Sequence, residues 1–408
     1  MSGSLPVSLR TKTLRTMHVR DLKGKRVIVR ADFDVPYRNG RILDTMRIQA
    51  VLPTLRFLLA RGASVRIVSH LGRPHGRRMS SLSLRNVAYV IRRSLRQHII
   101  FLEDPFSPAA LKLYSDSPAL IFFENVRFWP GEEKNSKQFA VGIARWGDIY
   151  INEAFANSHR AHASMVALPA LLPCRLGLYL EQELLHLSRL FTHPARPFVA
   201  ALGGAKLETK VPLIRRMLAH ADHVIVAGAL ANTLFAGQGL SIGKSLADRT
   251  PSHAWLKKLL CSPKLVLPSD VVVTPVLHGG KARVRVVNHE HVRRNEYIVD
   301  AGSASLATFA LLLKKAKTVV WNGPLGYIEA PRFTRGTREF AKTLPRTRGS
   351  FTVVGGGDTL AALHSPSLLA GVTHVSTGGG AMLAFLAGEK LPGVEALKKS
   401  KIQMSNVK

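Results

Sequence analysis

Four loops in the first half of the chain carry cationic side chains directly after short apolar runs. They are residues 30–36, 69–74, 124–128 and 152–162, and each contains an Arg, a His or both. Because parallel strands end at one edge of a sheet, four such loops would form a small basic pocket there. Arginine binds carboxylates and phosphates through paired hydrogen bonds, so the pattern favours a small anionic substrate over a polymer.

Single members of this set allow a simpler interpretation. Each Arg taken alone could be an ordinary solvated surface residue, and His70 and His159 could be loop histidines with local hydrogen bonds. The repetition of cations at four equivalent positions is what favours the pocket.

Glycine-rich turns follow the apolar runs of the second half. They are 203–206 (Gly-Gly-Ala-Lys), 227–229 (Ala-Gly-Ala), 322–324 (Asn-Gly-Pro), 355–358 (Gly-Gly-Gly-Asp) and 377–380 (Thr-Gly-Gly-Gly). Turns of this kind allow a ligand to approach the backbone closely, and the N–H groups of the following helices attract anions. The phosphate chain of a nucleotide fits this edge.

The best-known phosphate motifs are absent. No G-x-G-x-x-G sequence opens a predicted helix, and the His-Arg-Asp loop of protein kinases is missing. Residues 239–245 end like a P-loop, but Gln238 stands where its first glycine is required and no predicted strand precedes it. We interpret this segment as structural.

The elements around these loops alternate between short strands and amphipathic helices, which predicts an α/β fold with parallel sheets. In the first half we expect strands at 26–30, 64–69, 119–123 and 148–151 and a helix at 48–61. In the second half we expect strands at 198–202, 224–226, 318–321, 352–354 and 374–376. A helix at 182–191, broken by the prolines of 193–197, would connect the two series.

Length and composition set the remaining limits. A chain of 408 residues with 46% apolar residues is long enough for two domains. The chain has no apolar run of about 18 residues or more, so we do not expect a membrane span. Cys174 and Cys261 suggest neither a disulfide framework nor a zinc site. The first twenty residues are basic and lack acids, as in a weak transit peptide, but we favour a ragged N-terminus and a reducing, cytoplasmic location.

The formal net charge of +32 would attract any anion, nucleic acid included. The positive charge is spread over both halves rather than gathered in one tail, and aromatic residues are only 7% of the chain. Nucleic-acid surfaces usually combine a basic cluster with aromatics. We therefore expect nonspecific binding to nucleic acid at most.

The loops resemble those of the phosphoglycerate kinase family over about residues 22–397. The matching stretches are 29–36, 69–74, 124–128, 154–164, 203–206, 321–326, 355–359 and 376–381. The resemblance implies two doubly wound parallel-sheet domains that face a cleft and are joined by a helix. It implies an N-terminal domain (1–181), a hinge (182–197), a nucleotide domain (198–385) and a C-terminal segment (386–408) that returns to the first domain.

The resemblance also implies a monomeric glycolytic enzyme. Its reaction would be reversible, Mg²⁺-dependent in-line transfer of a phosphoryl group between 1,3-bisphosphoglycerate and ADP, giving 3-phosphoglycerate and ATP. The implied substrate-binding residues are Asp32, Phe33, Asp34, Arg47, Ser69, His70, Gly72, Arg73, Arg127, His159 and Arg160. The implied nucleotide-binding residues are Gly204, Ala205, Lys206, Lys210, Gly228, Ala229, Asn322, Pro324, Glu329, Gly357, Asp358 and Thr359. Asp358 would carry Mg²⁺, and Arg47, Lys206 and the helix N-terminus at Gly380 would stabilise the charge of the moving group.

Several positions depart from the family pattern. Asp34 stands where Asn is usual, Glu153 and Thr209 where Asp is usual, and Trp129 where His is usual. Ala227 and Ala229 replace glycines in the turn implied to border the adenine. An inactive relative or a basic polyanion-binding protein on the same fold are the alternatives, and the complete set of Arg, Lys and Asp side chains argues against inactivity.

Overall fold

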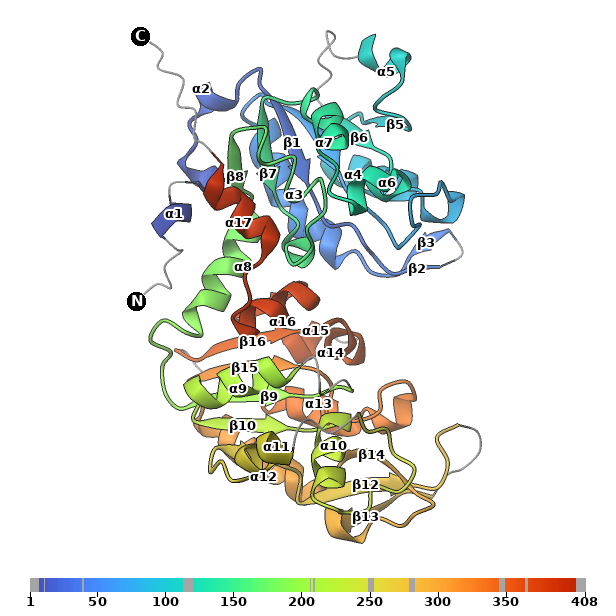
Figure 1. The fold of residues 1–408 in the computed structure, drawn as a ribbon, viewed down its shortest axis with the longest axis vertical. Coiled ribbons are helices and arrows are strands. Elements are labelled where there is room, and N and C mark those ends of the chain that lie inside the picture. The colour runs from blue at the N-terminus through green and yellow to red at the C-terminus, as the bar shows by residue number, and fades with distance from the viewer. Residues whose placement is uncertain are drawn as a thin grey trace. The chain divides into compact units, whose positions relative to one another are not determined.

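The computed structural model describes residues 7–10, 12–38, 40–112, 120–205, 207, 210–248, 253–278, 283–344, 349–363 and 366–400. These residues form two compact units, one running up to Leu185 and resuming at Lys390, the other running from His186 to Glu389. Figure 1 labels the elements of both units. None of the described helices is long and apolar enough to cross a membrane.

The first unit is built on a six-stranded parallel sheet in the order β5-β6-β4-β1-β7-β8. Its strands are β1 (Arg26–Arg30), β4 (Ser64–Val68), β5 (Ile100–Leu102), β6 (Leu120–Phe123), β7 (Ile149–Asn152) and β8 (Cys174–Leu176). Val29 of β1 pairs with Ile67 of β4 on one side and with Ile151 of β7 on the other. β2 (Tyr37–Arg38) and β3 (Arg41–Ile42) form a separate hairpin.

One face of this sheet packs on two helices, α3 (Met46–Leu59) and α4 (Arg85–Leu95). α3 buries Ile48, Val51, Leu55 and Leu58, the spacing of a helix with one apolar face. Because side chains alternate along a strand, the β1 residues on either side of Val29 point to the opposite face. Arg30 is one of them and is fully buried there.

The remaining elements of this unit are short helices and one connector. They are α1 (Val7–Arg10), η1 (Leu14–Thr16), α2 (Val19–Leu22), η2 (Ser80–Leu82), α5 (Pro108–Lys112), η3 (Val126–Phe128), α6 (Pro130–Glu133), α7 (Lys137–Ala144), η4 (Phe155–Asn157), α8 (Leu178–Arg189) and α17 (Pro392–Lys399). α8 begins in this unit and ends in the other.

The last helix among the described residues, α17, belongs to the first unit and lies beside β8 and α1 (Figure 1). The Lys12 ammonium group donates hydrogen bonds to the carbonyls of Leu397 (2.8 Å), Lys398 (3.0 Å) and Ser400 (2.6 Å). These carbonyls lie at the end of α17, where a helix leaves its acceptors unpaired, so a lysine from the opposite end of the chain caps the helix.

The second unit contains a parallel sheet in the order β11-β10-β9-β15-β16-β17 and an antiparallel sheet in the order β13-β12-β14. The parallel strands are β9 (Phe198–Leu202), β10 (His223–Val226), β11 (Leu265–Val266), β15 (Thr318–Asn322), β16 (Phe351–Gly355) and β17 (His374–Ser376). The antiparallel strands are β12 (Asp270–Thr274), β13 (Arg285–Asn288) and β14 (Tyr297–Ala301). The helices are α9 (Val211–His220), α10 (Ala229–Gly237), α11 (His253–Leu260), η6 (His289–His291), α12 (Ser303–Lys315), η7 (Pro331–Phe333), α13 (Arg335–Lys342), α14 (Gly357–Ala362), α15 (Pro366–Leu369) and α16 (Gly380–Ala387).

The predicted fold class, α/β with two parallel sheets, is confirmed. The antiparallel sheet and strands β5, β8 and β11 were not predicted. The segment that ends like a P-loop follows helix α10 rather than a strand, and Gly243 there pairs with Tyr297 in an isolated bridge at φ +59°. A Cβ atom at Gly243 would come within 2.1 Å of the Glu296 carbonyl, so the packing and the backbone conformation both require glycine at this position. The domain boundaries and the cleft stay predictions.

Candidate active site

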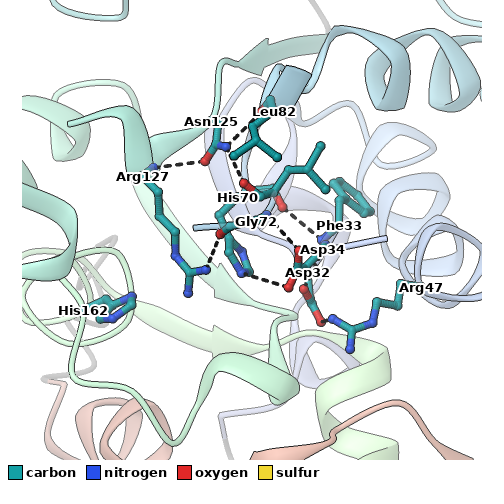
Figure 2. Close-up of polar contacts among 12 residues, drawn as sticks. Asp32, Phe33, Asp34, Arg47, His70, Gly72, Leu82, Asn125, Arg127 and His162 are labelled. Carbon is teal, nitrogen blue, oxygen red and sulfur yellow. Dashed lines mark hydrogen bonds and ion pairs between the residues drawn. The ribbon is translucent and has the colours of Figure 1, made fainter. Parts of the chain in front are cut away.

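The carboxyl ends of four neighbouring strands bring the predicted substrate residues together. β6, β4, β1 and β7 lie side by side, and the loops that follow them point to the same edge of the sheet. The residues placed there are Asp32, Phe33 and Asp34 after β1, Ser69, His70, Gly72 and Arg73 after β4, Arg127 in η3, His159 and Arg160 after η4, and Arg47 in the first turn of α3. We call this set the basic pocket; Figure 2 labels seven of its residues, Asp32, Phe33, Asp34, Arg47, His70, Gly72 and Arg127.

Two aspartates organise the β1 side of the basic pocket. The Arg47 guanidinium donates to the buried Asp32 carboxylate. Asp34 Oδ1 accepts a hydrogen bond of 2.9 Å from the Gly72 amide, and its Oδ2 lies 4.0 Å from His70 Nε2 (Figure 2). Gly72 adopts φ +63°, which a glycine does without strain. The Asp34 carboxylate therefore joins the β1 and β4 loops.

Arg127 lies deeper in the basic pocket, only 3% exposed. Its Nη1 donates to the Gly72 carbonyl at 2.7 Å, and its Nε lies 3.7 Å from Glu133 Oε1. Burial, and then the charges of Arg30 and Arg160, lower the pKa of Arg127 to about 10. The guanidinium stays charged at neutral pH in a strongly positive setting, which a bound anion would stabilise.

Two histidines of the basic pocket, His70 and His159, and the neighbouring His162 are held in their neutral form. Burial is the first cause in each case, and neighbouring arginines add to it. It lowers the pKa of His70 well below its usual value, lowers that of His159, and lowers that of His162 to about 3. The positive charge of the basic pocket therefore comes from arginine, and the histidines act as neutral hydrogen-bonding groups.

The structure adds two residues that the sequence analysis did not select. Arg30 is fully buried, and its Nη2 lies 3.4 Å from His70 Nδ1. His162 is buried with Nδ1 3.9 Å from Glu132 Oε1. Both stand in segments that were singled out, but nothing in their spacing shows that their side chains turn inward. Arg73, by contrast, is exposed.

Two departures from the family pattern lie away from the basic pocket. Trp129 packs edge-on against Phe106 at 5.6 Å, with the Arg78 guanidinium 5.0 Å from its ring. The Glu153 carboxylate is fully buried and accepts hydrogen bonds from Thr54 and from the amides of Tyr179 (3.0 Å) and Leu180 (3.1 Å). These amides open helix α8, so Glu153 caps that helix from another part of the chain.

The capping carboxylate predicts a pH-dependent stability. Burial raises the pKa of Glu153 to about 7, against the lowering effect of its hydrogen bonds. An acid with a raised folded pKa binds more protons in the folded state, so its contribution to stability falls as pH rises through 7. Comparing wild type with Glu153→Gln by urea unfolding, we expect wild type to lose about 1 kcal/mol relative to the variant between about pH 6 and 8. Parallel pH curves for the two proteins would contradict the raised pKa.

The second unit contains a cavity of about 300 Å³ at the carboxyl edge of its parallel sheet. The predicted nucleotide residues that line it are Gly204, Ala205, Gly228, Ala229, Pro324, Glu329 and Asp358. Its other walls include apolar side chains such as Phe235, Val271 and Leu325. An apolar cavity with a few polar groups at one end suits a flat base with a charged tail.

Lys210 lies beside Gly204, which lines this cavity, and is only 8% exposed. Its ammonium group donates to the Gly203 carbonyl and lies 3.5 Å from Asn322 Oδ1. Burial lowers the pKa of Lys210 to about 8, and the Asp358 carboxylate opposes this shift. Thr359 Oγ1 accepts a hydrogen bond from the Gly323 amide at 2.7 Å, which joins two of the glycine-rich turns.

Two further predicted residues lie at the first positions of helices. Gly357 opens α14 and Gly380 opens α16. Lys206 and Thr209 lie outside the described residues. The sequence analysis missed Asp300, a buried carboxylate that lines the cavity and accepts hydrogen bonds from the Gly336 and Ala301 amides.

An arginine-rich edge on one parallel sheet and a glycine-lined cavity at the edge of the other are typical of an α/β phosphotransferase. The family model "Phosphoglycerate kinase" matches residues 17–389. The chain belongs to the phosphoglycerate kinase family. The predicted family, and with it the predicted class of enzyme, are confirmed, and no observation favours an inactive relative.

Similar proteins cover nearly the whole chain. A protein named phosphoglycerate kinase from Desulforudis audaxviator is 42% identical over 95% of this chain and 99% of its own length. One from Pelotomaculum thermopropionicum is 41% identical over 95% and 98%. The solved structure of phosphoglycerate kinase from Coxiella burnetii has a TM-score of 0.81 and 36% identity, and covers 95% of this chain and 99% of that one.

Proposed function

We propose that this protein catalyses the reversible transfer of a phosphoryl group between 1,3-bisphosphoglycerate and ADP, giving 3-phosphoglycerate and ATP. The observation that carries the proposal is the basic pocket, in which arginines hold the charge and histidines stay neutral. A small molecule with a carboxylate and a phosphate matches several guanidinium groups at once. We also propose that the enzyme acts as a monomer in the cytoplasm and that its domains divide as the sequence predicts.

In this proposal 3-phosphoglycerate binds in the basic pocket. Arg127, Arg160 and Arg73 bind its anionic groups, and His70 and His159 donate or accept neutral hydrogen bonds to it. Asp32 and Asp34 face its hydroxyl and carboxylate end, and the amides of the Phe33, Ser69 and Gly72 loops shape the floor. Arg47, held by Asp32 at the start of α3, would contact the transferred group.

The nucleotide occupies the cavity of the second unit. Gly204, Ala205, Gly228, Ala229 and Pro324 border its base and ribose, and Glu329 accepts from the ribose hydroxyls. A further set reaches its phosphates, namely Lys206, Lys210, Asn322, Gly357 and Thr359. Burial disfavours the charged form of the Lys210 ammonium group, and a bound phosphate would stabilise that form again. This favours a role for Lys210 in phosphate binding.

The donor set around the cavity fits Mg²⁺ that arrives with the nucleotide. The described residues contain no group of three or more His, Cys, Asp or Glu side chains that could hold a metal alone. Mg²⁺ in phosphoryl-transfer sites is held by one or two carboxylates together with substrate phosphates. Asp358, which lines the cavity, provides one such carboxylate. The ion would neutralise charge on the nucleotide phosphates.

Catalysis in this proposal is positioning and electrostatics. The moving phosphoryl group carries charge on its equatorial oxygens, which Arg47, Lys206 and the N-terminus of α16 at Gly380 would stabilise. In this proposal different units bind the two substrates, and we expect a closing step that assembles the two sets of residues and excludes water.

The first experiment is a coupled assay on purified protein. It contains ATP, Mg²⁺ and 3-phosphoglycerate, and a dehydrogenase that reduces 1,3-bisphosphoglycerate reports turnover as loss of NADH. We expect turnover that stops when Mg²⁺ or 3-phosphoglycerate is omitted. Folded protein with no turnover, tested also with GTP, would overturn the proposal.

The Asp34 carboxylate predicts a gain on substitution. Asp34→Asn keeps an oxygen that can accept from the Gly72 amide, but it removes a negative charge that faces an anionic substrate. We expect kcat to stay the same and the KM for 3-phosphoglycerate to fall by about two- to tenfold, since one charge contact near a protein surface is of that order. A large loss of activity would show that the carboxylate has a role of its own.

A further inference from the structure

A carboxylate is buried behind the basic pocket and has no place in the proposed chemistry. Glu132 in α6 has no exposed surface, and it accepts hydrogen bonds from the Ser164 amide (2.9 Å) and the Ser164 hydroxyl (2.6 Å). The Tyr150 hydroxyl donates to the Ser164 carbonyl at 2.9 Å, which fixes the same residue from the sheet side. Ser164 is therefore held in one position and one orientation.

The Ser164 hydroxyl in turn fixes the orientation of the Arg30 guanidinium. A hydroxyl has one proton to donate, and the Ser164 proton is donated to Glu132, so its lone pairs are left to accept. Arg30 Nε lies 2.7 Å from Ser164 Oγ and donates to it, and Arg30 Nη1 donates to the Ala31 carbonyl. The guanidinium is fully buried, and these bonds hold its plane in place.

Arg30 in turn determines which nitrogen of His70 carries the proton. Its Nη2 lies 3.4 Å from His70 Nδ1. Arginine can only donate, so Nδ1 must accept, and the proton of the neutral ring is on Nε2. That nitrogen lies 4.0 Å from Asp34 Oδ2, on the side where the substrate residues gather (Figure 2).

The charges around His70 agree with a neutral ring. Arg30, Arg127 and Arg47 all lower the pKa of His70, after burial itself. Asp34 is the carboxylate that faces the ring, and its distance of 4.0 Å exceeds that of a hydrogen bond. A protonated His70 ring would thus lie among positive charges. Arg30 lies beside Nδ1, the nitrogen that would have to gain the proton.

We propose that Glu132 is a positioning residue that acts through Ser164 and Arg30 to hold His70 as the tautomer with its proton on Nε2. His70 then presents a fixed donor to an anionic oxygen of the substrate and never competes with it as an acceptor. The tautomer itself is a property of the protein alone, whereas its use in binding 3-phosphoglycerate rests on the proposed function.

The tautomer can be measured directly on the full chain without turnover. Long-range ¹H–¹⁵N correlation spectra of ¹⁵N-labelled protein separate protonated from unprotonated imidazole nitrogens, and His70→Gln assigns the signals. We expect His70 to show a protonated Nε2 and an unprotonated Nδ1 throughout about pH 6 to 8, where an ordinary histidine titrates. A protonated Nδ1, or a ring that titrates in this range, would overturn the proposal.

Two variants test the chain of contacts. Ser164→Ala removes the hydroxyl that joins Glu132 to Arg30, and Glu132→Gln keeps the size of the side chain but removes its charge. In each we expect mixed tautomers at His70 and a KM for 3-phosphoglycerate raised about tenfold, the value of one hydrogen bond, with the KM for ATP unchanged. Ser164→Thr, which keeps the hydroxyl, should restore the single tautomer.

A control separates positioning from loss of structure. Ser136→Ala also removes a serine hydroxyl near α6, one that accepts from the Phe139 amide at the start of α7. We expect it to leave the His70 signals and both KM values unchanged. Wild-type tautomer signals in folded Ser164→Ala and Glu132→Gln would refute the role of Glu132. The expected spectra in a protein without turnover would leave the tautomer assignment intact and count against the proposed function instead.

Discussion

Arg47→Ala is expected to lower kcat by about a thousandfold while the protein stays folded, because the lost charge acts on the moving phosphoryl group. Arg47 stands in the first turn of α3 and is held by the Asp32 carboxylate, with 27% of its side chain exposed. The Arg47 guanidinium is fixed by its ion pair but remains partly exposed, so it can contact a ligand without leaving a packed core.

The fold should tolerate this change. The apolar face of α3 is made by Ile48, Val51, Leu55 and Leu58, and Arg47 is not part of it. Arg56→Ala is the matched control, because it removes the same charged group from the same helix at an exposed position. Coupled-assay kinetics and urea unfolding of both variants make the comparison. Near-normal turnover by Arg47→Ala, or an equal loss in Arg56→Ala, would refute the catalytic assignment.

Asp358→Asn is expected to lower kcat by about a hundredfold and to raise the Mg²⁺ concentration needed for half-maximal rate. Asp358 lies in the first turn of α14, lines the cavity of the second unit, and raises the pKa of Lys210 against the effect of burial. An amide of the same size keeps the helix start but removes the anionic oxygen that a hard cation prefers.

The magnesium titration separates a metal role from a structural one. Glu339→Gln removes a half-exposed carboxylate of α13 that pairs with Lys342 at 2.8 Å, so it serves as the control. We expect its rate and its Mg²⁺ dependence to match those of wild type. If Asp358→Asn lost rate without any shift in the Mg²⁺ titration, the carboxylate would have to act on the nucleotide by another route.

The parallel sheets could be predicted because their strands combine two local signals. Phe198–Leu202 is an apolar run bounded by prolines on one side and a glycine turn on the other, and β9 has these bounds. Strands β12 and β13 are not followed by a glycine-rich turn and an α-helix, and β14 is followed by the single Gly302 before α12. Antiparallel pairing depends on partners that are distant in the sequence, as Val272 and Asp300 show, and a single chain segment does not reveal it.

The loops of the candidate site could be predicted from the sequence, but the directions of their side chains could not. Arg30 and His162 stand in segments that were recognised, yet only the sheet geometry shows that they turn inward. Glu153 was noted as a departure within a substrate loop, whereas its carboxylate caps α8. Asp300 lies in a strand that was not predicted, so nothing in the sequence linked it to the cavity.

The cap that Lys12 provides for α17 has a consequence for synthesis of the chain. The first unit needs residues from both ends, since α17 begins only at Pro392, whereas the second unit is one continuous stretch from His186 to Glu389. A ribosome therefore delivers every residue of the second unit before the first can be completed. The first unit, although most of it is made first, can therefore be completed only after more than two hundred further residues have been translated.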